Sequence, residues 1–274
     1  MKAKQVVVSG VFDDIRSNHI RFLEEASRFG ELTVLLWTDD IVKQRQGRPP
    51  QFPQAERLYF LQAVRFVRQV QLMTNPFDAD ALPEGIGFKP DVWVIHESDG
   101  NAAKKAICRA HGLQCHLVRD EDLRGFPEAP IDTTFDSGRK KVVVTGSYDW
   151  FHSGHVRFFE EVSAQGDLYV IVGHDANIRL LKGEVHPLLP EAERRYVVGS
   201  IKYVKQALIS SGAGWLDADP EIRRLKPDIY VVNEDGDKGG KREYCAKLGI
   251  EYLVLKRAPA PGLPERTSTS LRGF

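Results

Sequence analysis

The sequence predicts an α/β protein with two tandem domains, each built on a doubly wound parallel sheet. Strand-like apolar runs alternate with helix-like segments along the 274 residues, which are enough for two ordinary domains, and the pattern of the first half returns in the second. Residues 125–138 separate the halves, because they are rich in turn residues and have no period. We therefore expect domains at residues 1–136 and 137–274.

The repeat is the clearest organisational feature of the chain. Residues 6–22 align without gaps to residues 142–158, and nine of these seventeen positions are identical. The second-half segment begins with four apolar or β-branched residues before Gly146, a run typical of a strand covered on both faces. It continues with the pattern of an amphipathic helix. The other matching stretches are residues 53–57 with 190–194 and 89–94 with 226–231.

Each half is expected to contain the same elements in the same order, with parallel strands joined by helices. The expected elements, given for the first and then the second half, are a first strand (6–8; 142–145), a helix around Phe22 or Phe158, a second strand (32–37; 168–172), a helix from residue 53 or 190, a strand near Val70 or Ala207, a strand from Val92 or Ile229, a helix ending at Gly112 or Gly249, and a last strand (115–118; 252–255). The second half has a further helix-like stretch at 175–181, before Lys182.

Composition and motifs exclude several classes of protein. Thirty-eight basic and thirty-eight acidic residues leave no net charge to attract nucleic acid. The apolar runs have strand length and no secretory h-region opens the chain, so we expect a cytoplasmic protein without membrane insertion. Three cysteines without C-x-x-C spacing favour neither disulfides nor a zinc site, and no metal ligands are assigned. Glycine motifs of dehydrogenases and P-loop proteins are absent from the sequence.

The segment from Thr145 to His155 is the expected site of chemistry. His152 and His155 follow the carboxyl end of a strand and enter a helix. Open α/β sheets bind ligands at such ends, and helix N-termini present free N–H groups to phosphate. Both imidazoles can therefore direct ring N–H groups at a phosphate, although a capped turn with two surface histidines would give the same pattern.

The segment resembles the cytidylyltransferase-like nucleotidyltransferases, whose first strand ends in G-x-(F/Y)-D-x-x-H-x-G-H. Residues 146–155 read Gly-Ser-Tyr-Asp-Trp-Phe-His-Ser-Gly-His. The resemblance continues at Lys182-Gly183, at Glu193-Arg194 and at residues 266–270, Arg-Thr-Ser-Thr-Ser, which look like a shortened R-T-x-G-I-S-T-T element. It implies Rossmann-like domains that transfer CMP from CTP to a phospho-alcohol or sugar phosphate, with release of pyrophosphate and a requirement for Mg²⁺.

The resemblance also assigns residues to roles in the second half. Asp149 and Arg194 match family positions but could instead be a cap and a carboxylate partner. Alternatives for the whole protein are an adenylyltransferase that uses ATP and a nucleotide-binding regulatory protein without turnover. The implied catalytic residues are His152, His155, Lys182 and Arg266; the implied nucleotide-binding residues are Thr145, Gly146, Ser147, Tyr148, Asp149, Gly154, Arg194, Asn233, Asp235, Thr267, Ser268, Thr269 and Ser270.

The first half departs from this pattern at its phosphate-binding positions. Arg16 replaces His152 of the second half, Asn18 replaces a glycine and Gln46 replaces Lys182. Residues 129–133 stand where Arg266 and its neighbours would be. We expect a non-catalytic first half and one CTP per chain; the alternative is a site rebuilt for another ligand, such as an anion held by Arg16 and Arg48.

A fused tandem also has a consequence for assembly. The resembling single-domain enzymes are homodimers that join partly through an R-Y-V segment, which corresponds here to residues 65–67 and 202–204. The resemblance therefore implies a pseudo-dimer formed within one chain. Further homo-oligomerisation is left open, and the sequence does not identify the phosphorylated acceptor.

Overall fold

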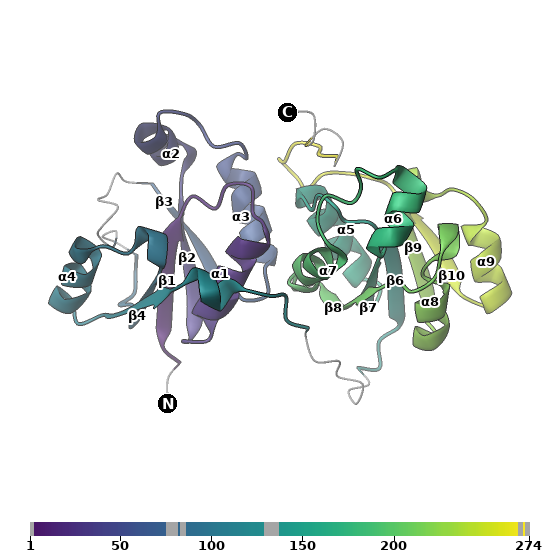
Figure 1. Ribbon diagram of the computed structural model, residues 1–274, viewed down its shortest axis with the longest axis horizontal. Coiled ribbons are helices and arrows are strands. Elements are labelled where there is room, and N and C mark those ends of the chain that lie inside the picture. Colours follow the sequence, from purple (N-terminus) through teal and green to yellow (C-terminus); the bar gives the residue numbers. More distant parts are fainter. Residues whose placement is uncertain (1–2, 75–81, 83–85, 129–136, 268–270, 272–274) are drawn as a thin grey trace. The chain divides into compact units, whose positions relative to one another are not determined.

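The computed structural model describes residues 3–74, 82, 86–128, 137–267 and 271 and divides the chain into two α/β units (Figure 1). The first unit comprises residues 1–125 and the second residues 126–274. The expected boundary between residues 136 and 137 adjoins residues 129–136, which lie outside the described part of the chain. The expected fold class is confirmed, since each unit contains one five-stranded parallel sheet with helices between its strands.

In the first unit the strand order is β3-β2-β1-β4-β5, and every pairing is parallel. The chain moves outward from the central strand in one direction and then returns to add strands on the other side, which is the doubly wound arrangement. The elements are β1 (Gln5–Gly10), α1 (Ser17–Ser27), β2 (Glu31–Trp37), α2 (Asp39–Gln46), α3 (Gln54–Ala63), β3 (Gln69–Met73), β4 (Val92–His96), η1 (Glu97–Asp99), α4 (Ala102–Ala110), β5 (Gln114–Val118) and η2 (Asp120–Leu123).

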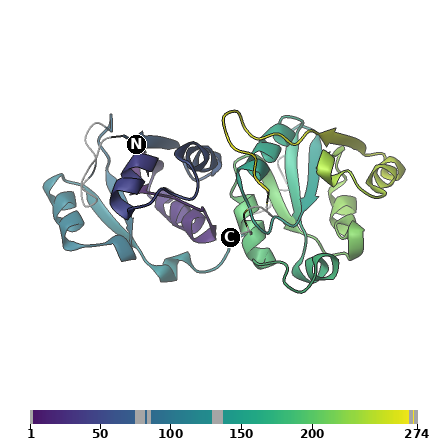
Figure 2. The ribbon, with the colours of Figure 1, turned by 90° about the horizontal axis from the view of Figure 1, so that it is seen from above.

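The second unit repeats this topology, with the order β8-β7-β6-β9-β10 and parallel pairing throughout. Helices lie on both sides of its sheet (Figure 2). The elements are β6 (Lys141–Gly146), α5 (Ser153–Ser163), β7 (Asp167–Val172), α6 (Asp175–Lys182), α7 (Glu191–Gly199), β8 (Val204–Ile209), η3 (Gly214–Leu216), α8 (Asp219–Leu225), β9 (Ile229–Asn233), η4 (Glu234–Gly236), α9 (Lys241–Leu248) and β10 (Glu251–Leu255).

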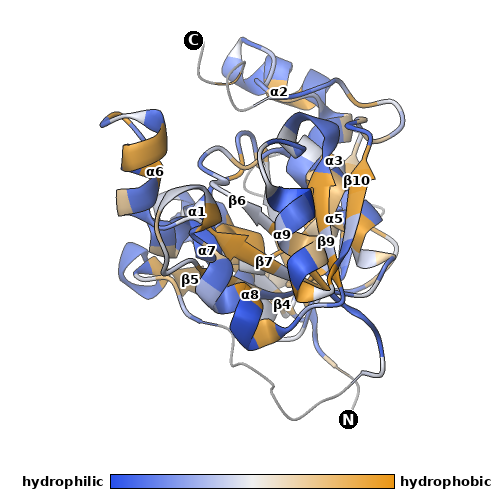
Figure 3. Cartoon of the chain, turned by 90° about the vertical axis from the view of Figure 1, so that its right-hand side faces the viewer, coloured by the Kyte–Doolittle hydropathy of each residue, from blue (hydrophilic) through white to orange (hydrophobic). Residues whose placement is uncertain are grey.

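The cores follow the expected patterning. Val142, Val143 and Val144 of β6 have no exposed surface, as expected for a central strand covered on both faces. An exception to apolar burial lies on α6, where Leu180 and Leu181 are 71% and 55% exposed; part of α6 has the orange of hydrophobic residues in Figure 3. Among the described residues, no helix is both long and apolar enough to cross a bilayer.

Candidate active site

A pocket of about 340 Å³ opens in the second unit where the carboxyl ends of β6 and β9 meet. The chain adds strands to opposite sides of the sheet at this point, and such switch points are where doubly wound sheets bind ligands. Most of the residues that the sequence assigns to the site lie here together. The assigned residues that line the pocket are Thr145, Gly146, Ser147, Tyr148, His152, Gly154, His155, Lys182, Asn233 and Asp235.

The turn that leads into α5 fixes both histidines. His152 caps the helix, and its Nδ1 accepts a hydrogen bond from the backbone N–H of Gly154 at 3.1 Å. The Nδ1 of His155 accepts from the backbone N–H of His152 at 3.3 Å, and the two ring centres are 4.0 Å apart. A neutral imidazole that accepts at Nδ1 carries its proton on Nε2. Both rings therefore offer Nε2–H as a donor.

The Nε2–H group of His152 donates no hydrogen bond to the described part of the protein. The residue is 3% exposed, and its Nε2 finds no hydrogen-bond partner among the described residues. An unpaired buried polar atom costs free energy, so such atoms are rare away from binding sites. Since His152 lines the pocket, this Nε2–H is placed to bind an acceptor atom of a ligand.

The surroundings keep both histidines neutral. Burial, assisted by the positive charges of Arg257 and Arg266, lowers the pKa of His152 to about 4. Burial is also the main cause that holds the pKa of His155 well below its usual 6.5, with smaller effects from His152, Arg257 and Lys182. At neutral pH the pair acts through polar N–H groups, and the positive charge of the site comes from other side chains.

Aromatic packing and one glycine give the imidazoles their positions. The ring of His155 stacks on Phe151 at 5.2 Å and meets the edge of Tyr148 at 5.4 Å. A Cβ on Gly154 would lie only 2.9 Å from Cε1 of His152 and 3.0 Å from its Nδ1. Glycine is needed at this position because the imidazole occupies the space of a side chain.

Two cations face the histidines, and the sequence predicted one of them. Lys182, the last residue of α6, donates from Nζ to the Ser147 hydroxyl at 2.8 Å. Arg257, which follows β10, lines the same pocket and was not predicted. Its guanidinium binds the Asp235 carboxylate at 2.5 Å. The clue in the sequence was its place after the last strand, since carboxyl ends of parallel strands share one edge of the sheet.

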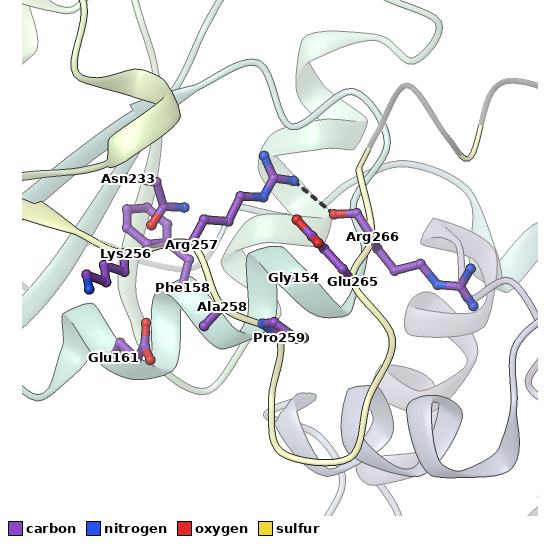
Figure 4. A pocket seen from close by; sticks show the side chains of 10 residues that line it. All are labelled: Gly154, Phe158, Glu161, Asn233, Lys256, Arg257, Ala258, Pro259, Glu265 and Arg266. Carbon is purple, nitrogen blue, oxygen red and sulfur yellow. Dashed lines mark hydrogen bonds between the residues drawn. The ribbon is translucent and has the colours of Figure 1, made fainter.

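Arg266 stands outside the lining of this pocket. It lines a smaller adjoining pocket, where its backbone oxygen accepts a hydrogen bond from Arg257 at 2.8 Å. In Figure 4 its side chain extends away from the guanidinium of Arg257. Thr267 follows and accepts the backbone N–H of Leu271 with its carbonyl at 3.2 Å. The remaining residues expected in this segment, Ser268, Thr269 and Ser270, lie outside the described residues.

Comparison with known proteins identifies the family. Residues 143–258 match the model of the cytidylyltransferase-like family. The FAD synthase of Ferroglobus placidus is 38% identical over 120 residues, which cover 43% of this chain and 75% of that protein. The chain belongs to the cytidylyltransferase-like family. The FAD synthase of Pyrococcus horikoshii is 40% identical over 138 residues, or 49% of this chain and 90% of the relative.

Two further matches cover other shares of the chain. The bifunctional protein HldE of Geobacter metallireducens is 33% identical over 170 residues, which cover 57% of this chain and 33% of HldE. A solved structure of a lipopolysaccharide core biosynthesis protein from Thermoplasma volcanium covers 44% of this chain and 98% of its own, with 25% identity and a TM-score of 0.37. The chain is thus a nucleotidyltransferase family member, whereas CTP as its donor stays a prediction.

The side chains of Asp149 and Arg194, at two family positions, form hydrogen bonds to other parts of the protein. Arg194 is 1% exposed and donates to the carbonyls of Leu189, Ser147 and Gly173 and to the Asp175 carboxylate, all at 2.5–2.9 Å. Asp149 is 2% exposed and accepts the backbone N–H groups of residues 188 and 189. These contacts indicate that the pair holds the loops around the cytidylyltransferase-like site, the structural alternative considered for both residues.

The first unit keeps the turn but not the cations that correspond to Lys182 and Arg257. The Nδ1 of His19 accepts the backbone N–H of Arg16 at 3.2 Å, as His155 does from His152. Arg16 forms an ion pair with Asp14 at 3.0 Å. Asp120 occupies the place of Arg257, because its backbone N–H binds the Glu97 carboxylate just as that of Arg257 binds Glu234. The first unit therefore lacks the arginine of the second, in addition to the lysine replaced by Gln46 and the histidine replaced by Arg16.

Proposed function

We propose that the second unit is an adenylyltransferase, which transfers AMP from ATP to a phosphate monoester and releases pyrophosphate. The observation that carries the reaction type is the pair of neutral Nε2–H donors facing Lys182 and Arg257 across one pocket. The donor nucleotide is proposed from the relatives. FAD is FMN joined to AMP through a pyrophosphate bond, so a FAD synthase that works by nucleotidyl transfer needs an adenylyl donor.

The proposed reaction needs no covalent intermediate with the protein. An oxygen of the acceptor phosphate attacks the α-phosphorus of ATP, the bond to the bridging α–β oxygen breaks, and the electron pair leaves with pyrophosphate. The acceptor phosphate is largely dianionic at neutral pH and is itself the nucleophile. Charge grows on the α-phosphate oxygens and on the leaving oxygen, where fixed donors in a water-poor site are most effective.

The residues divide this task by their chemistry. The Nε2–H groups of His152 and His155 bind the α-phosphate and the leaving oxygen. Lys182 and Arg257 supply positive charge to the acceptor phosphate and to the departing pyrophosphate. Lys182 rests on the Ser147 hydroxyl, which a phosphate would replace as its partner. The flexible stem of lysine makes this exchange inexpensive.

We propose FMN as the first acceptor to test. The relatives support this choice by name, and the site adds an apolar surface beside Lys182. Leu180, Leu181 and Val185 are 71%, 55% and 75% exposed on the segment that carries this lysine. Exposed apolar side chains of this size are energetically favourable to cover, and a flat ring attached to the acceptor phosphate would cover them.

Magnesium is proposed as a companion of the nucleotide and not as a resident ion. Among the described residues, no three His, Cys, Asp or Glu side chains form a group that could hold a metal. The Asp235 carboxylate near the pocket is bound by Arg257. A Mg²⁺ ion would therefore enter on the triphosphate, whose charge it would partly neutralise.

The test is pyrophosphate release by the full chain in a grid of donors and acceptors. ATP and CTP are each combined with FMN, glycerol 3-phosphate, ethanolamine phosphate and a sugar 1-phosphate, with and without Mg²⁺. We expect ATP with FMN to be the fastest pair and the variant Lys182→Gln to be slowed. A faster reaction with CTP would overturn the adenylyl assignment. Nucleotide binding without pyrophosphate from any pair would indicate a regulatory protein instead.

A further inference from the structure

The first unit contains a pocket of about 710 Å³ at the carboxyl ends of β1 and β4, the place that corresponds to the active site of the second unit. Every residue that lines it lies between residues 9 and 123. The pocket is larger than its counterpart, at 710 against 340 Å³. Its lining has also changed in kind, with fewer cations and more aromatic rings.

We infer that this pocket binds an uncharged, nucleoside-type ligand, which consists of a flat heteroaromatic ring and a hydroxylated sugar or chain without a triphosphate. The inference goes beyond the proposed transferase reaction, since it assigns a second ligand site to the half of the chain that lacks the histidine pair.

The charges around the pocket disfavour a triphosphate. Gln46 lines it where the second unit has Lys182, and Asp120 lines it where the second unit has Arg257. Arg16 is held by Asp14 at 3.0 Å. Lys104 also lines the pocket, and its Nζ binds the carbonyl of Asp99 at 2.8 Å. Arg48 also lines the pocket, and its positive charge lies at an exposed position, where water and salt screen it.

Aromatic side chains form the walls. Trp37 occupies the position of Gly173, so the first unit has an indole where the second has no side chain. Its Nε1–H donates to the Ser9 hydroxyl at 2.8 Å, and the Arg45 guanidinium lies 5.1 Å from the ring centre, so the indole is held in one orientation. Trp93, which replaces Tyr230, is 3% exposed and lines the pocket as well.

The rim supplies hydrogen-bonding groups suited to hydroxyls. His96 meets Phe22 edge to face at 6.2 Å, and its Nε2 lies 3.0 Å from the Asp120 carboxylate. The side chain of Asp120 is 82% exposed, so its oxygens remain accessible to a ligand. A carboxylate accepts strongly from sugar hydroxyls and repels phosphate. Rings that stack on a base and a carboxylate that binds its sugar together define a nucleoside site.

Equilibrium dialysis of the full chain with radiolabelled adenosine or riboflavin tests the inference, since both probes are uncharged and differ in ring size. Saturating ATP is present to occupy the second unit. We expect one of these probes to bind with one molecule per chain under these conditions. Trp37→Ala should weaken that binding at least about tenfold, the lower range for loss of one base-stacking side chain. Trp215→Ala, which changes a 54% exposed tryptophan of the second unit, should leave it unchanged.

Asp120→Asn provides an independent check, because this exposed side chain can be changed without disturbing the core. We expect it to weaken binding about tenfold through loss of a charge-assisted hydrogen bond. The inference is overturned if neither probe binds at concentrations up to about 1 mM, a level typical of weak ligands. It is equally overturned if both the Trp37 and Asp120 variants bind the probe normally in the presence of saturating ATP.

Discussion

His152 has two separable functions, and replacing it by asparagine divides them. Its Nδ1 caps α5 by accepting the N–H of Gly154, while its Nε2–H faces the pocket. An asparagine Oδ1 can take over the cap, as Asn101 does at the start of α4, where it accepts the N–H of Lys104 at 2.8 Å. Asparagine ends before the position of Nε2. His152→Asn therefore removes the donor and retains the cap.

The expected magnitudes follow from these two contacts. Loss of one preorganised donor to a charge that develops in the transition state costs about 2.7–4 kcal/mol, or about 10²–10³ in kcat. Loss of a helix cap costs about 1 kcal/mol of stability. We expect His152→Asn to lower kcat by that factor with the free energy of unfolding nearly unchanged. His152→Ala should lower both quantities.

Single-turnover release of pyrophosphate and urea unfolding at pH 7.5 measure the two effects on the same preparations. Arg16→Asn is the matched control, because Arg16 precedes α1 in the first unit as His152 precedes α5 in the second. It should change neither turnover nor the response to nucleotide. An asparagine variant of His152 that turns over at nearly the normal rate would refute the role given to Nε2.

Three further outcomes are expected. Between about pH 7 and 9, kcat/KM should not fall with the slope of a group that titrates near 6.5, because both active-site histidines are already neutral; a tenfold loss per pH unit would contradict this. Since folding lowers the pKa of His152 from 6.5 to about 4, this residue should contribute a decrease of about 3 kcal/mol to the free energy of unfolding as the pH falls across that interval, and His152→Asn should show a pH dependence smaller by that amount in urea titrations, with the part due to His155 retained. Gly154→Ala should displace the imidazole and reduce kcat about 10- to 100-fold with stability retained, whereas Asn18→Ala in the first unit should not affect turnover.

The fold was predictable because local sequence patterns determine its strands and helices, and because the same patterns occur in both halves. Strands such as residues 142–144 are continuous apolar runs, and the duplication allowed each half to check the element order of the other. The helix α8, Asp219–Leu225, was not predicted. It has seven residues and begins with Asp-Pro, so it is too short to show a helical period and looks like a turn in sequence.

The site was predictable only where a motif and its strand end coincide. His152, His155 and Gly154 lie within four residues of one another, so local sequence fixes their arrangement. Arg257 enters the site because β10 pairs with β9 and β9 pairs with β6, which brings together strands from opposite ends of the sequence of this unit. The orientation of Arg266 depends on the chain that follows β10 and has no local pattern. Long-range packing decides where such side chains lie, which is why the sequence did not predict Arg257 in the pocket lining.

The duplication separates the residues that hold the fold from those that hold the ligand. Arg57 of the first unit donates to the carbonyls of Phe52 and Val11 and to the Asp39 carboxylate, at the same 2.9, 2.5 and 2.7 Å that Arg194 shows to its equivalent partners. This arginine thus persists in a unit that has lost the cations of the nucleotide site.

A residue needed only for phosphate would have no reason to keep its geometry there. We therefore expect Arg57→Met and Arg194→Met to be alike in their main effect, a loss of about 3–5 kcal/mol of stability in the unit concerned, since each leaves at least two carbonyls without the buried guanidinium that binds them and removes the ion pair of a partly exposed carboxylate. Urea unfolding of each variant measures the effect, with Lys182→Gln as the control that should lose activity alone. If Arg194→Met had the normal free energy of unfolding and lost only nucleotide affinity, the main role of this arginine would be ligand binding. The geometry of Arg57 in the first unit would then need another explanation.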